Sequence, residues 1–367
     1  MSLERVLGMV VKEFRQVFRD PRMARVIFVA PVLQLLVFGY AVSTDIHDTP
    51  TFVVDHDRSL ASRELVDVLT ASGYFRIVAG SDRPRDLVRA LETGEVVVGL
   101  VIPADFGRDL ASPEGARLQL LFDGTHSNTA SVAQSYAERI LADFARRKSP
   151  AFSPPVDLRD RPWFNPNLES RVYNVPAVVG ALIMLVCLLL TSLAVVRERE
   201  IGTLEQLKVS PLTAGELIAG KTIPFALIGL VDLTIVTSFA LIWFEVPFRG
   251  SLWLLLLASV LYILSALGIG LLISTISTTQ QEAFMSSFLV FMPAILLSGF
   301  MFPVTSMPES FQWVTLVNPV RHYIEIVRAI FLKGAGLEAL SFQFAALLLI
   351  GVGLLWFAAA RFRKSSS

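Results

Sequence analysis

The segment at residues 215–222, GELIAGKT, has the spacing of a phosphate-binding loop, with four residues between two glycines and then a lysine and a threonine. Such a loop binds nucleotide phosphates through its backbone amides when a strand precedes it and a soluble helix follows it. Here Pro-Leu-Thr precedes the segment, residues 216–219 have helical character, and an apolar run begins at Thr222. No apolar strand ending in aspartate follows that could hold magnesium. We therefore expect this chain itself to bind no ATP, magnesium or other cofactor.

Histidines beside aspartates form the second candidate for chemistry. The residues concerned are His47, His56, Asp45, Asp48, Asp55 and Asp57. Their spacing matches no recognised metal-ligand pattern, whereas aspartates commonly initiate turns in solvated loops. The sequence also has no serine-nucleophile elbow and no plausible Cys–His pair. It therefore predicts neither a metal site nor a catalytic residue, and an enzyme is the least favoured class.

Composition indicates a membrane protein. Hydrophobic residues make up 53% of the chain and charged residues 17%, against soluble averages of about 45–50% and about 25%. A helix needs about 20 apolar residues to cross a bilayer. Six windows approach or exceed this length: residues 26–44, 173–196, 222–244, 251–275, 283–302 and 342–360. The predicted fold class is a polytopic α-helical membrane protein with six transmembrane helices.

Basic residues predict the orientation, because lysine and arginine favour the cytoplasmic side. They cluster in residues 1–20, 197–221 and 361–367, which share one side of a six-span chain. Residues 1–20 also form an amphipathic interfacial helix, whose apolar positions repeat at helical spacing: Leu3, Val6, Leu7, Val10, Phe14 and Val17. We expect both termini in the cytoplasm. The formal net charge is zero, so no nucleic-acid partner is expected.

Residues 45–171, between the first two spans, then lie outside the opposite membrane face. Short β-rich runs alternate there with helical runs. The predicted strands are residues 51–54, 74–78, 96–102 and 118–122, and the predicted helices are residues 60–70, 84–91 and 127–147. This alternation predicts a small α/β extracytoplasmic domain with a core of its own.

The charged loop at residues 197–221 lies between two predicted spans and is too polar to enter hydrocarbon. Residues 197–207, followed by Ser-Pro-Leu at 210–212 and Gly-Lys at 220–221, resemble the cytoplasmic loop of ABC-2 type transporter permeases. The resemblance is greatest to bacterial drug-efflux permeases with a large periplasmic domain. Further matches are Trp-Phe-Asn-Pro at 163–166, Val-Pro at 175–176 and Asn-Pro at 318–319, and together they extend from about residue 160 to the end.

The resemblance implies one half of an exporter in the inner membrane of a bacterial cell. Two permeases, identical or related, form the translocation path for the substrate, and separate ABC ATPase subunits bind ATP and magnesium. A periplasmic adaptor and membrane lipid are further expected partners. The loop is a coupling element that docks on the ATPase, and the residues expected to make that contact are Glu198, Glu200, Thr203, Leu204, Glu205, Leu207 and Lys208. The alternative is that the charges form only a solvated, positive-inside face.

Two further features of the sequence are candidates for the translocation path. Residues 305–333 are too charged to span and are expected to form an extracytoplasmic re-entrant segment, as in the family. Asp232 lies 11 residues beyond Lys221 in the third predicted span, near the bilayer midplane. An acid at that depth is a polar anchor for cationic substrates or a site that changes protonation. Alternatively, it forms a hydrogen bond with a hydroxyl such as that of Thr191, Ser192 or Ser265, or a contact across the permease dimer.

The predicted function is export of small amphiphilic or hydrophobic compounds from the cytoplasm or inner membrane by a permease subunit that a separate ATPase powers. A membrane-anchored sensor with a periplasmic ligand-binding domain is the alternative from another class. A sensor normally has fewer spans and a cytoplasmic output domain. An ion-gradient-driven transporter would work without ATP. The substrate, and the choice between homodimer and heterodimer, remain open.

Overall fold

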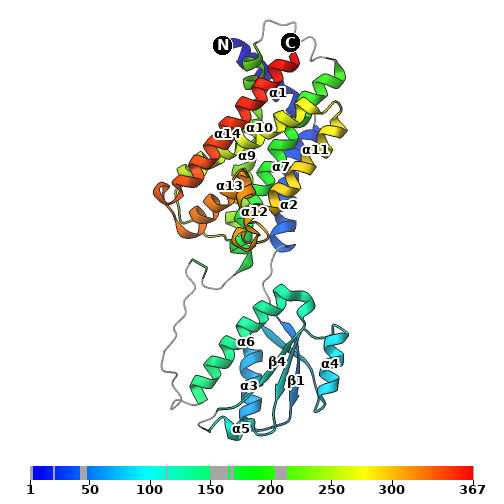
Figure 1. The fold of residues 1–367 in the computed structure, drawn as a ribbon, viewed down its shortest axis with the longest axis vertical. Coiled ribbons are helices and arrows are strands. Elements are labelled where there is room, and N and C mark those ends of the chain that lie inside the picture. The colour runs from blue at the N-terminus through cyan, green and yellow to red at the C-terminus, as the bar shows by residue number, and fades with distance from the viewer. Residues whose placement is uncertain are drawn as a thin grey trace. The chain divides into compact units, whose positions relative to one another are not determined.

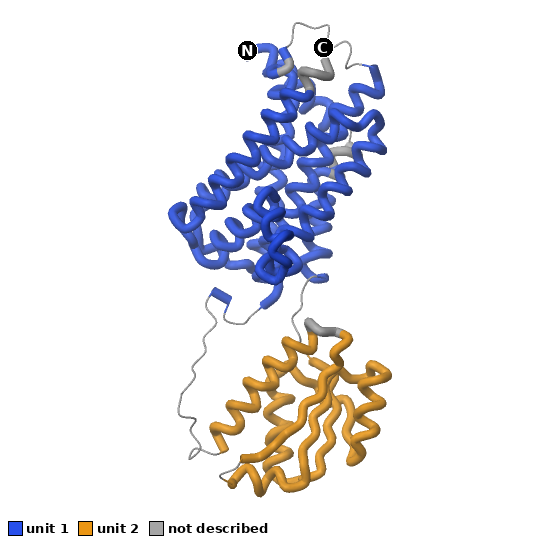
Figure 2. The backbone as a smooth tube through the Cα atoms, in the orientation of Figure 1, with its two compact units in different colours: residues 1–43, 162–367 blue, residues 44–161 orange. Residues whose placement is uncertain are grey.

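The computed structural model describes residues 3–19, 21–41, 48–112, 115–148, 164–165, 169–202 and 213–366. The chain divides into a helical unit, residues 1–43 and 162–367, and an α/β unit, residues 44–161 (Figures 1 and 2). The helical unit contains α1 (Leu3–Arg19), α2 (Pro21–Ala41), α7 (Ser170–Ile201), α9 (Ala214–Trp243), α10 (Leu252–Ile276), α11 (Gln280–Leu296), α12 (Glu309–Thr315), α13 (Pro319–Arg328) and α14 (Leu337–Ser366).

Among the described residues, four helices are long and apolar enough to cross a membrane. They are α7, residues Gly215–Trp243 of α9, α10, and residues Leu337–Arg361 of α14. The other two predicted spans coincide with α2 and α11. In α2 the apolar stretch is Ile27–Ala41, and α11 has 17 residues, or about 25 Å against about 30 Å of hydrocarbon. The chain is a mostly helical, polytopic membrane protein.

Helix α7 lies at the centre of the helical unit and contacts α2, α9, α10, α11 and α13. Small residues allow these close approaches. A Cβ added at Gly229 of α9 would lie 2.7 Å from the Cys187 sulfur, and one at Gly270 of α10 would lie 2.9 Å from the Thr191 Cβ. Because lipid tails compete equally for apolar side chains, close backbone packing is a main source of helix association in membranes. The glycines therefore hold the bundle around α7.

The segment expected to be re-entrant, residues 305–333, folds into α12, α13 and a five-residue π-helical turn, Ala329–Lys333. It packs into the bundle through Tyr323, whose ring stacks on Tyr262 at 4.0 Å between centroids. The Tyr323 hydroxyl is 2.8 Å from that of Ser259. The Tyr262 hydroxyl donates to the Gly180 carbonyl of α7 at 2.9 Å. This segment is therefore fixed to both α7 and α10.

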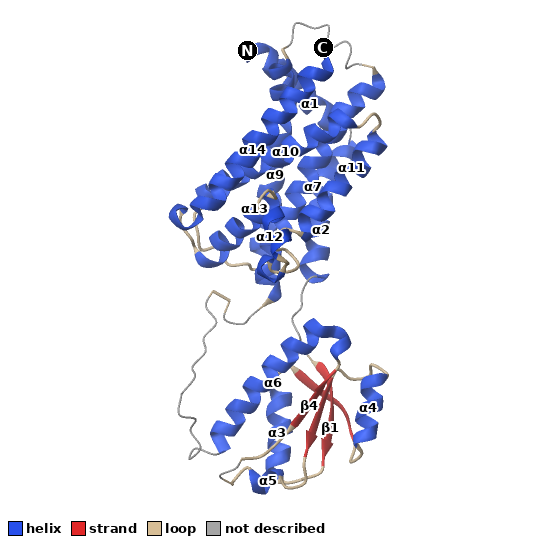
Figure 3. Cartoon of the chain, viewed as in Figure 1, coloured by secondary structure: helices blue, strands red, loops and turns tan. Residues whose placement is uncertain are grey.

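The α/β unit is built on a four-stranded sheet in the order β2-β1-β3-β4 (Figure 3). Its elements are β1 (Thr49–Asp55), α3 (Leu60–Ala71), β2 (Phe75–Gly80), α4 (Pro84–Glu92), β3 (Val98–Ile102), α5 (Phe106–Asp109), β4 (Gln119–Phe122) and α6 (Ser127–Lys148). Strand β1 pairs in parallel with β2 and β3, and β4 pairs antiparallel with β3. Apart from α5, which the sequence did not predict, these elements begin and end within about two residues of the predicted ones.

Helices cover both faces of this sheet. Leu65 and Leu69 of α3 and Ala133 and Phe144 of α6 form one core with the sheet. Leu87 and Ala90 of α4 form a second core with Phe52 and Val54 of β1. The connections from β1 and β2 therefore leave toward opposite faces. The two diverging connections leave a crevice at the carboxyl ends of β1 and β2.

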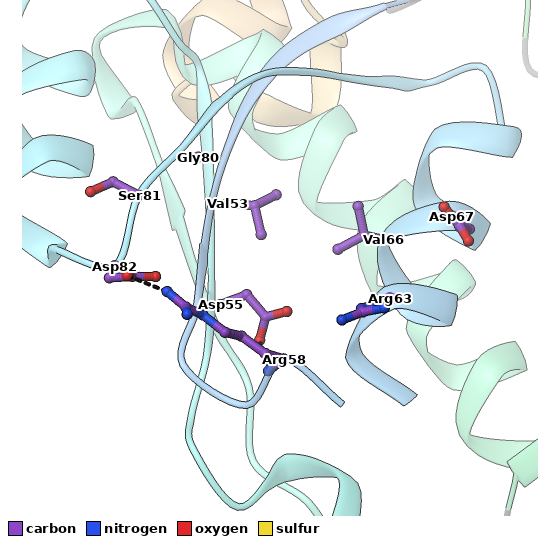
Figure 4. A pocket seen from close by; sticks show the side chains of 9 residues that line it. All are labelled: Val53, Asp55, Arg58, Arg63, Val66, Asp67, Gly80, Ser81 and Asp82. Carbon is purple, nitrogen blue, oxygen red and sulfur yellow. Dashed lines mark hydrogen bonds and ion pairs between the residues drawn. The ribbon is translucent and has the colours of Figure 1, made fainter. Parts of the chain in front are cut away.

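A hollow of about 720 Å³ lies at that crevice, where β1 and β2 end against α3 (Figure 4). Arg58 crosses it to pair with Asp82. That pair lowers the pKa of the Asp82 carboxyl, first through the Arg58 hydrogen bond and then through the arginine charge. Asp55 accepts hydrogen bonds from the Asp57 and Arg58 amides at 3.0 and 2.9 Å, so its carboxylate closes a turn. Among the described residues, no group of three His, Cys, Asp or Glu side chains could hold a metal; Asp45 and His47 lie outside them.

Candidate coupling site

The segment with phosphate-loop spacing is the first part of helix α9. Thr213 caps the helix, because its hydroxyl accepts from the Glu216 amide at 3.3 Å and its own amide donates to the Glu216 carboxylate at 2.9 Å. This reciprocal arrangement is a capping box, and it places Gly215, Gly220 and Lys221 inside a continuous helix. The helix predicted for residues 216–219 is confirmed. The backbone amides needed to cradle a phosphate are not arranged as a loop.

Lys221 takes part instead in a buried ion cluster, which we define as Lys12 and Glu13 of α1, Glu198 of α7 and Lys221 of α9. The Lys221 ammonium lies 3.0 Å from Glu13 Oε1 and 2.8 Å from Glu198 Oε2. Lys12 pairs with the other oxygen of Glu198 and lies 3.9 Å from Glu13. The cluster therefore joins three helices that are distant in sequence.

The cluster combines two cations with two anions, and three of its members are almost fully buried. The side chains of Glu13, Glu198 and Lys221 are 2%, 4% and 2% exposed, and that of Lys12 is 44% exposed. Burying an unpaired charge is costly, and breaking a buried pair by removing one partner typically destabilises by about 3–5 kcal/mol. The arrangement is therefore sensitive to the loss of any single buried charge.

Helix α1 is held against α9 by packing as well as by charge. Its buried residues are Val6, Met9, Glu13 and Val17. A Cβ added at Gly220 of α9 would lie 2.6 Å from Met9 Cγ, so the two helices touch where the cluster forms. The buried stripe differs from the predicted apolar positions, since Leu3 and Leu7 are 80% and 61% exposed. An acid within the buried stripe, Glu13, is the sequence signal for the cluster that the pattern analysis missed.

The end of α7 is also tied to the turn between α10 and α11. Arg199 donates to the Ser277 carbonyl at 2.6 Å. Glu200 accepts from the Gln280 amide at 2.8 Å, and Arg197 donates to the Gln280 side-chain oxygen at 3.3 Å. The last turn of α7 is therefore fixed to both α1 and α11 before the chain enters residues 203–212.

The expected coupling residues fall into two groups. Glu198 and Glu200 lie in the last turns of α7, so the helix extends into the charged loop. Glu198 is not solvated, although its charged surroundings in the sequence predict exposure: it is 3% exposed, because Lys12 and Lys221 pair with its carboxylate. The other expected residues, Thr203, Leu204, Glu205, Leu207 and Lys208, lie outside the described residues.

Asp232 lies in the interior of the bundle, in α9, with its side chain fully buried. Neither carboxylate oxygen has a hydrogen-bond partner among the described residues. The hydroxyls expected to bond to the Asp232 carboxylate have other partners. Thr191 donates to the Cys187 carbonyl, Ser192 pairs with Ser287, and Ser265 donates to the Leu261 carbonyl. The hydrogen-bonding role expected within one chain is therefore not observed.

A bundle that contains four membrane-length helices among the described residues defines the class of integral membrane proteins. Residues 25–360 match the family model described as ABC-2 family transporter protein. The chain therefore belongs to the ABC-2 transporter family.

Known relatives extend over nearly the whole chain. The probable multidrug ABC transporter permease YbhR of Escherichia coli K12 is 36% identical over 91% of each chain. The probable multidrug permease YbhS of the same organism is 34% identical over 91% of this chain and 90% of its own. The inner membrane transport permease YhhJ of the same organism is 28% identical over 99% of this chain and 98% of its own.

These findings assign the class of protein. The chain is a membrane permease subunit of an ABC exporter and a transport component, not itself an enzyme. The family implies an ABC ATPase partner and a dimeric permease arrangement. The sensor and the ion-gradient-driven transporter are not favoured.

Proposed function

We propose that this permease exports small amphiphilic or hydrophobic compounds from the cytoplasm or the inner membrane, driven by ATP hydrolysis in a separate subunit. The multidrug relatives support the substrate class. The helical form of the phosphate-loop segment supports an external source of energy. The observation that carries the proposal is the buried ion cluster, which joins α1, α7 and α9 beside the loop expected to meet the ATPase.

The proposed topology has six spans, with residues 26–44 and 283–302 as the first and fifth. Both termini and the charged loop then lie in the cytoplasm, and the α/β unit and residues 305–333 lie on the periplasmic side. The three basic clusters of the sequence support this orientation. The short apolar stretches of α2 and α11 are accommodated by local bilayer thinning or by packing against neighbouring helices.

The proposed coupling runs along α7. This helix has 32 residues, or about 48 Å, and reaches from the charged loop to the segment containing α13. At its far end the Arg328 guanidinium lies 3.7 Å from the centre of the Tyr173 ring and donates to the Gly299 carbonyl at 3.0 Å. A displacement of the loop by the ATPase therefore moves α13 and the end of α11 together with α7.

Asp232 is the proposed contact for substrate within the bundle. Its carboxylate is buried without a hydrogen-bond partner among the described residues, and intramembrane acids commonly mark transport pathways. A cationic group on an amphiphilic substrate would supply the missing partner. The alternative is that a polar residue of the second permease pairs with the Asp232 carboxylate.

The coupling proposal is tested in the permease–ATPase complex with Glu205→Lys in the charged loop. We expect normal membrane abundance, together with reduced co-purification of the ATPase and reduced substrate-stimulated hydrolysis. The matched control is Glu309→Lys, an exposed carboxylate at the start of α12, on the face proposed to be periplasmic. Equal co-purification for both variants and the parent would contradict docking at this loop.

The transport proposal is tested separately in vesicles that contain the complex. We expect accumulation of a fluorescent amphiphilic cation that requires ATP and stops when the ATPase is inactivated. Accumulation that follows an imposed ion gradient without ATP would contradict it.

A further inference from the structure

A second hollow, of about 630 Å³, lies between α1 and the end of α7. We call it the basic hollow, because four cations line it: Lys12, Arg15 and Arg19 of α1 and Arg197 of α7. No acidic residue is among the described residues that line it. A phosphate or another strong anion is the natural ligand of several convergent cations.

Two of these cations have no acidic partner among the described residues. Arg15 and Arg19 lie one turn apart on α1 and are exposed, and no ion pair joins them to an acid in the described part of the chain. Lys12 is engaged with Glu198, and Arg197 donates to Gln280. The positive charge of the hollow is therefore only partly balanced by the protein.

The hollow also has an apolar wall, formed by Gly8 and Val11 of α1. A Cβ added at Gly8 would meet no atom within 4 Å, so the space beside it is open. Val11 is 41% exposed, and Leu7 on the same helix is 61% exposed. Exposed apolar residues beside arginines match a molecule that carries an acyl chain and a phosphate. They match an acidic protein surface less well.

We propose that the basic hollow binds the phosphate headgroup of an anionic phospholipid, with Arg15 and Arg19 on the phosphate and the acyl chain along Val11. The inference depends on the membrane location of the chain and not on what it transports. Basic pockets between helices at the cytoplasmic face are suited to such headgroups.

Bound lipid would also act on the buried ion cluster. Lys12 lines the hollow and pairs with Glu198, which in turn pairs with Lys221. A phosphate beside Lys12 competes with Glu198 for that ammonium group. The site therefore links the lipid composition of the membrane to the position of α1 against α7 and α9.

The test is binding of short-chain phosphatidylglycerol to the detergent-solubilised full chain, measured by native mass spectrometry, with phosphatidylcholine of the same chain length as reference. The parent should prefer phosphatidylglycerol. Arg15→Gln/Arg19→Gln should weaken its binding about 30-fold, because each cation near a membrane surface contributes about a factor of five. Arg15→Lys/Arg19→Lys should retain most of the preference.

The matched control is Arg85→Gln/Arg89→Gln, which removes two exposed arginines with the same spacing from α4 of the α/β unit. It should bind like the parent. Gly8→Leu gives a second variant that leaves the charge unchanged; its side chain should occupy the open space and weaken binding of both lipids.

Three outcomes would overturn the proposal. The Arg15/Arg19 variant could keep the parent's preference for phosphatidylglycerol. Inorganic phosphate could displace the lipid at equal concentration, which would make free phosphate the ligand. Lipid binding could stay unchanged while the same variant loses its ATPase partner, which would assign the hollow to an acidic protein surface.

Discussion

Replacing Lys221 by methionine tests whether the buried ion cluster is a structural junction. Methionine keeps an unbranched side chain but removes the charge that lies 3.0 and 2.8 Å from Glu13 and Glu198. Two buried carboxylates then share only Lys12, whose side chain is 44% exposed. Loss of one partner from a buried pair typically destabilises by about 3–5 kcal/mol, and we expect Lys221→Met to fall in this range.

The second arm of the experiment restores neutrality. Lys221→Met/Glu13→Gln leaves Lys12 and Glu198 as one balanced pair, so most of the lost stability should return, to within about 1–2 kcal/mol of the parent. Glu13→Gln alone leaves two cations facing Glu198 and should be less harmful than Lys221→Met, because Lys12 reaches solvent. The assay is reversible unfolding of the solubilised permease in mixed detergent, followed by tryptophan fluorescence.

Lys333→Met serves as the control, because Lys333 is exposed at the end of the π-helical turn, and it should change stability by less than about 0.5 kcal/mol. If Lys221→Met is as stable as this control, the cluster does not hold the helices together. The same conclusion follows if the effects of the two single variants simply add in the double variant. ATP should not bind to the isolated parent or to Lys221→Met.

Other predictions address topology, substrate contact and packing. Cysteines introduced at Gly94 and Ser366 should react with an impermeant thiol reagent from the periplasmic and the cytoplasmic side, respectively, and labelling of position 94 from the cytoplasm would overturn the six-span orientation. Asp232→Asn should lower export of cationic compounds several-fold at equal abundance while export of neutral compounds stays unchanged; equal export of both would leave Asp232 with a packing role. Gly220→Leu should destabilise by about 1–3 kcal/mol, because its Cβ would lie 2.6 Å from Met9 Cγ, and Met9→Ala should recover part of that loss, as measured by the same unfolding assay.

Local patterns allowed much of the secondary structure to be predicted. The strands and helices of the α/β unit alternate in short runs with clear turn residues, so periodicity located them within about two residues. The long apolar runs of α7, α9 and α10 were equally clear. Helix α11 ends sooner than the apolar run suggested: Pro293 is inside its last turn, and Gly299 has φ +80°, so the apolar residues 297–302 continue outside the helix.

Charge pairing could not be predicted in the same way. Glu198 stands among arginines and glutamates in a loop-like stretch, and local polarity alone indicated exposure. Its burial depends on Lys12 and Lys221, which periodicity does not connect to it. The one local signal was Glu13, an acid in phase with Val6, Met9 and Val17. For Asp232 the burial was predictable from its depth, but the lack of a hydrogen-bond partner among the described residues was not.

The cluster also has a consequence for biosynthesis. Glu13 and Lys221 are separated by 208 positions in the chain. At a typical translation rate of 5–20 residues per second, Glu13 emerges roughly 10–40 s before its partner. Helix α1 therefore cannot reach its final contacts until α9 has been made. Docking of α1 thus reports that synthesis of the permease has proceeded at least as far as α9.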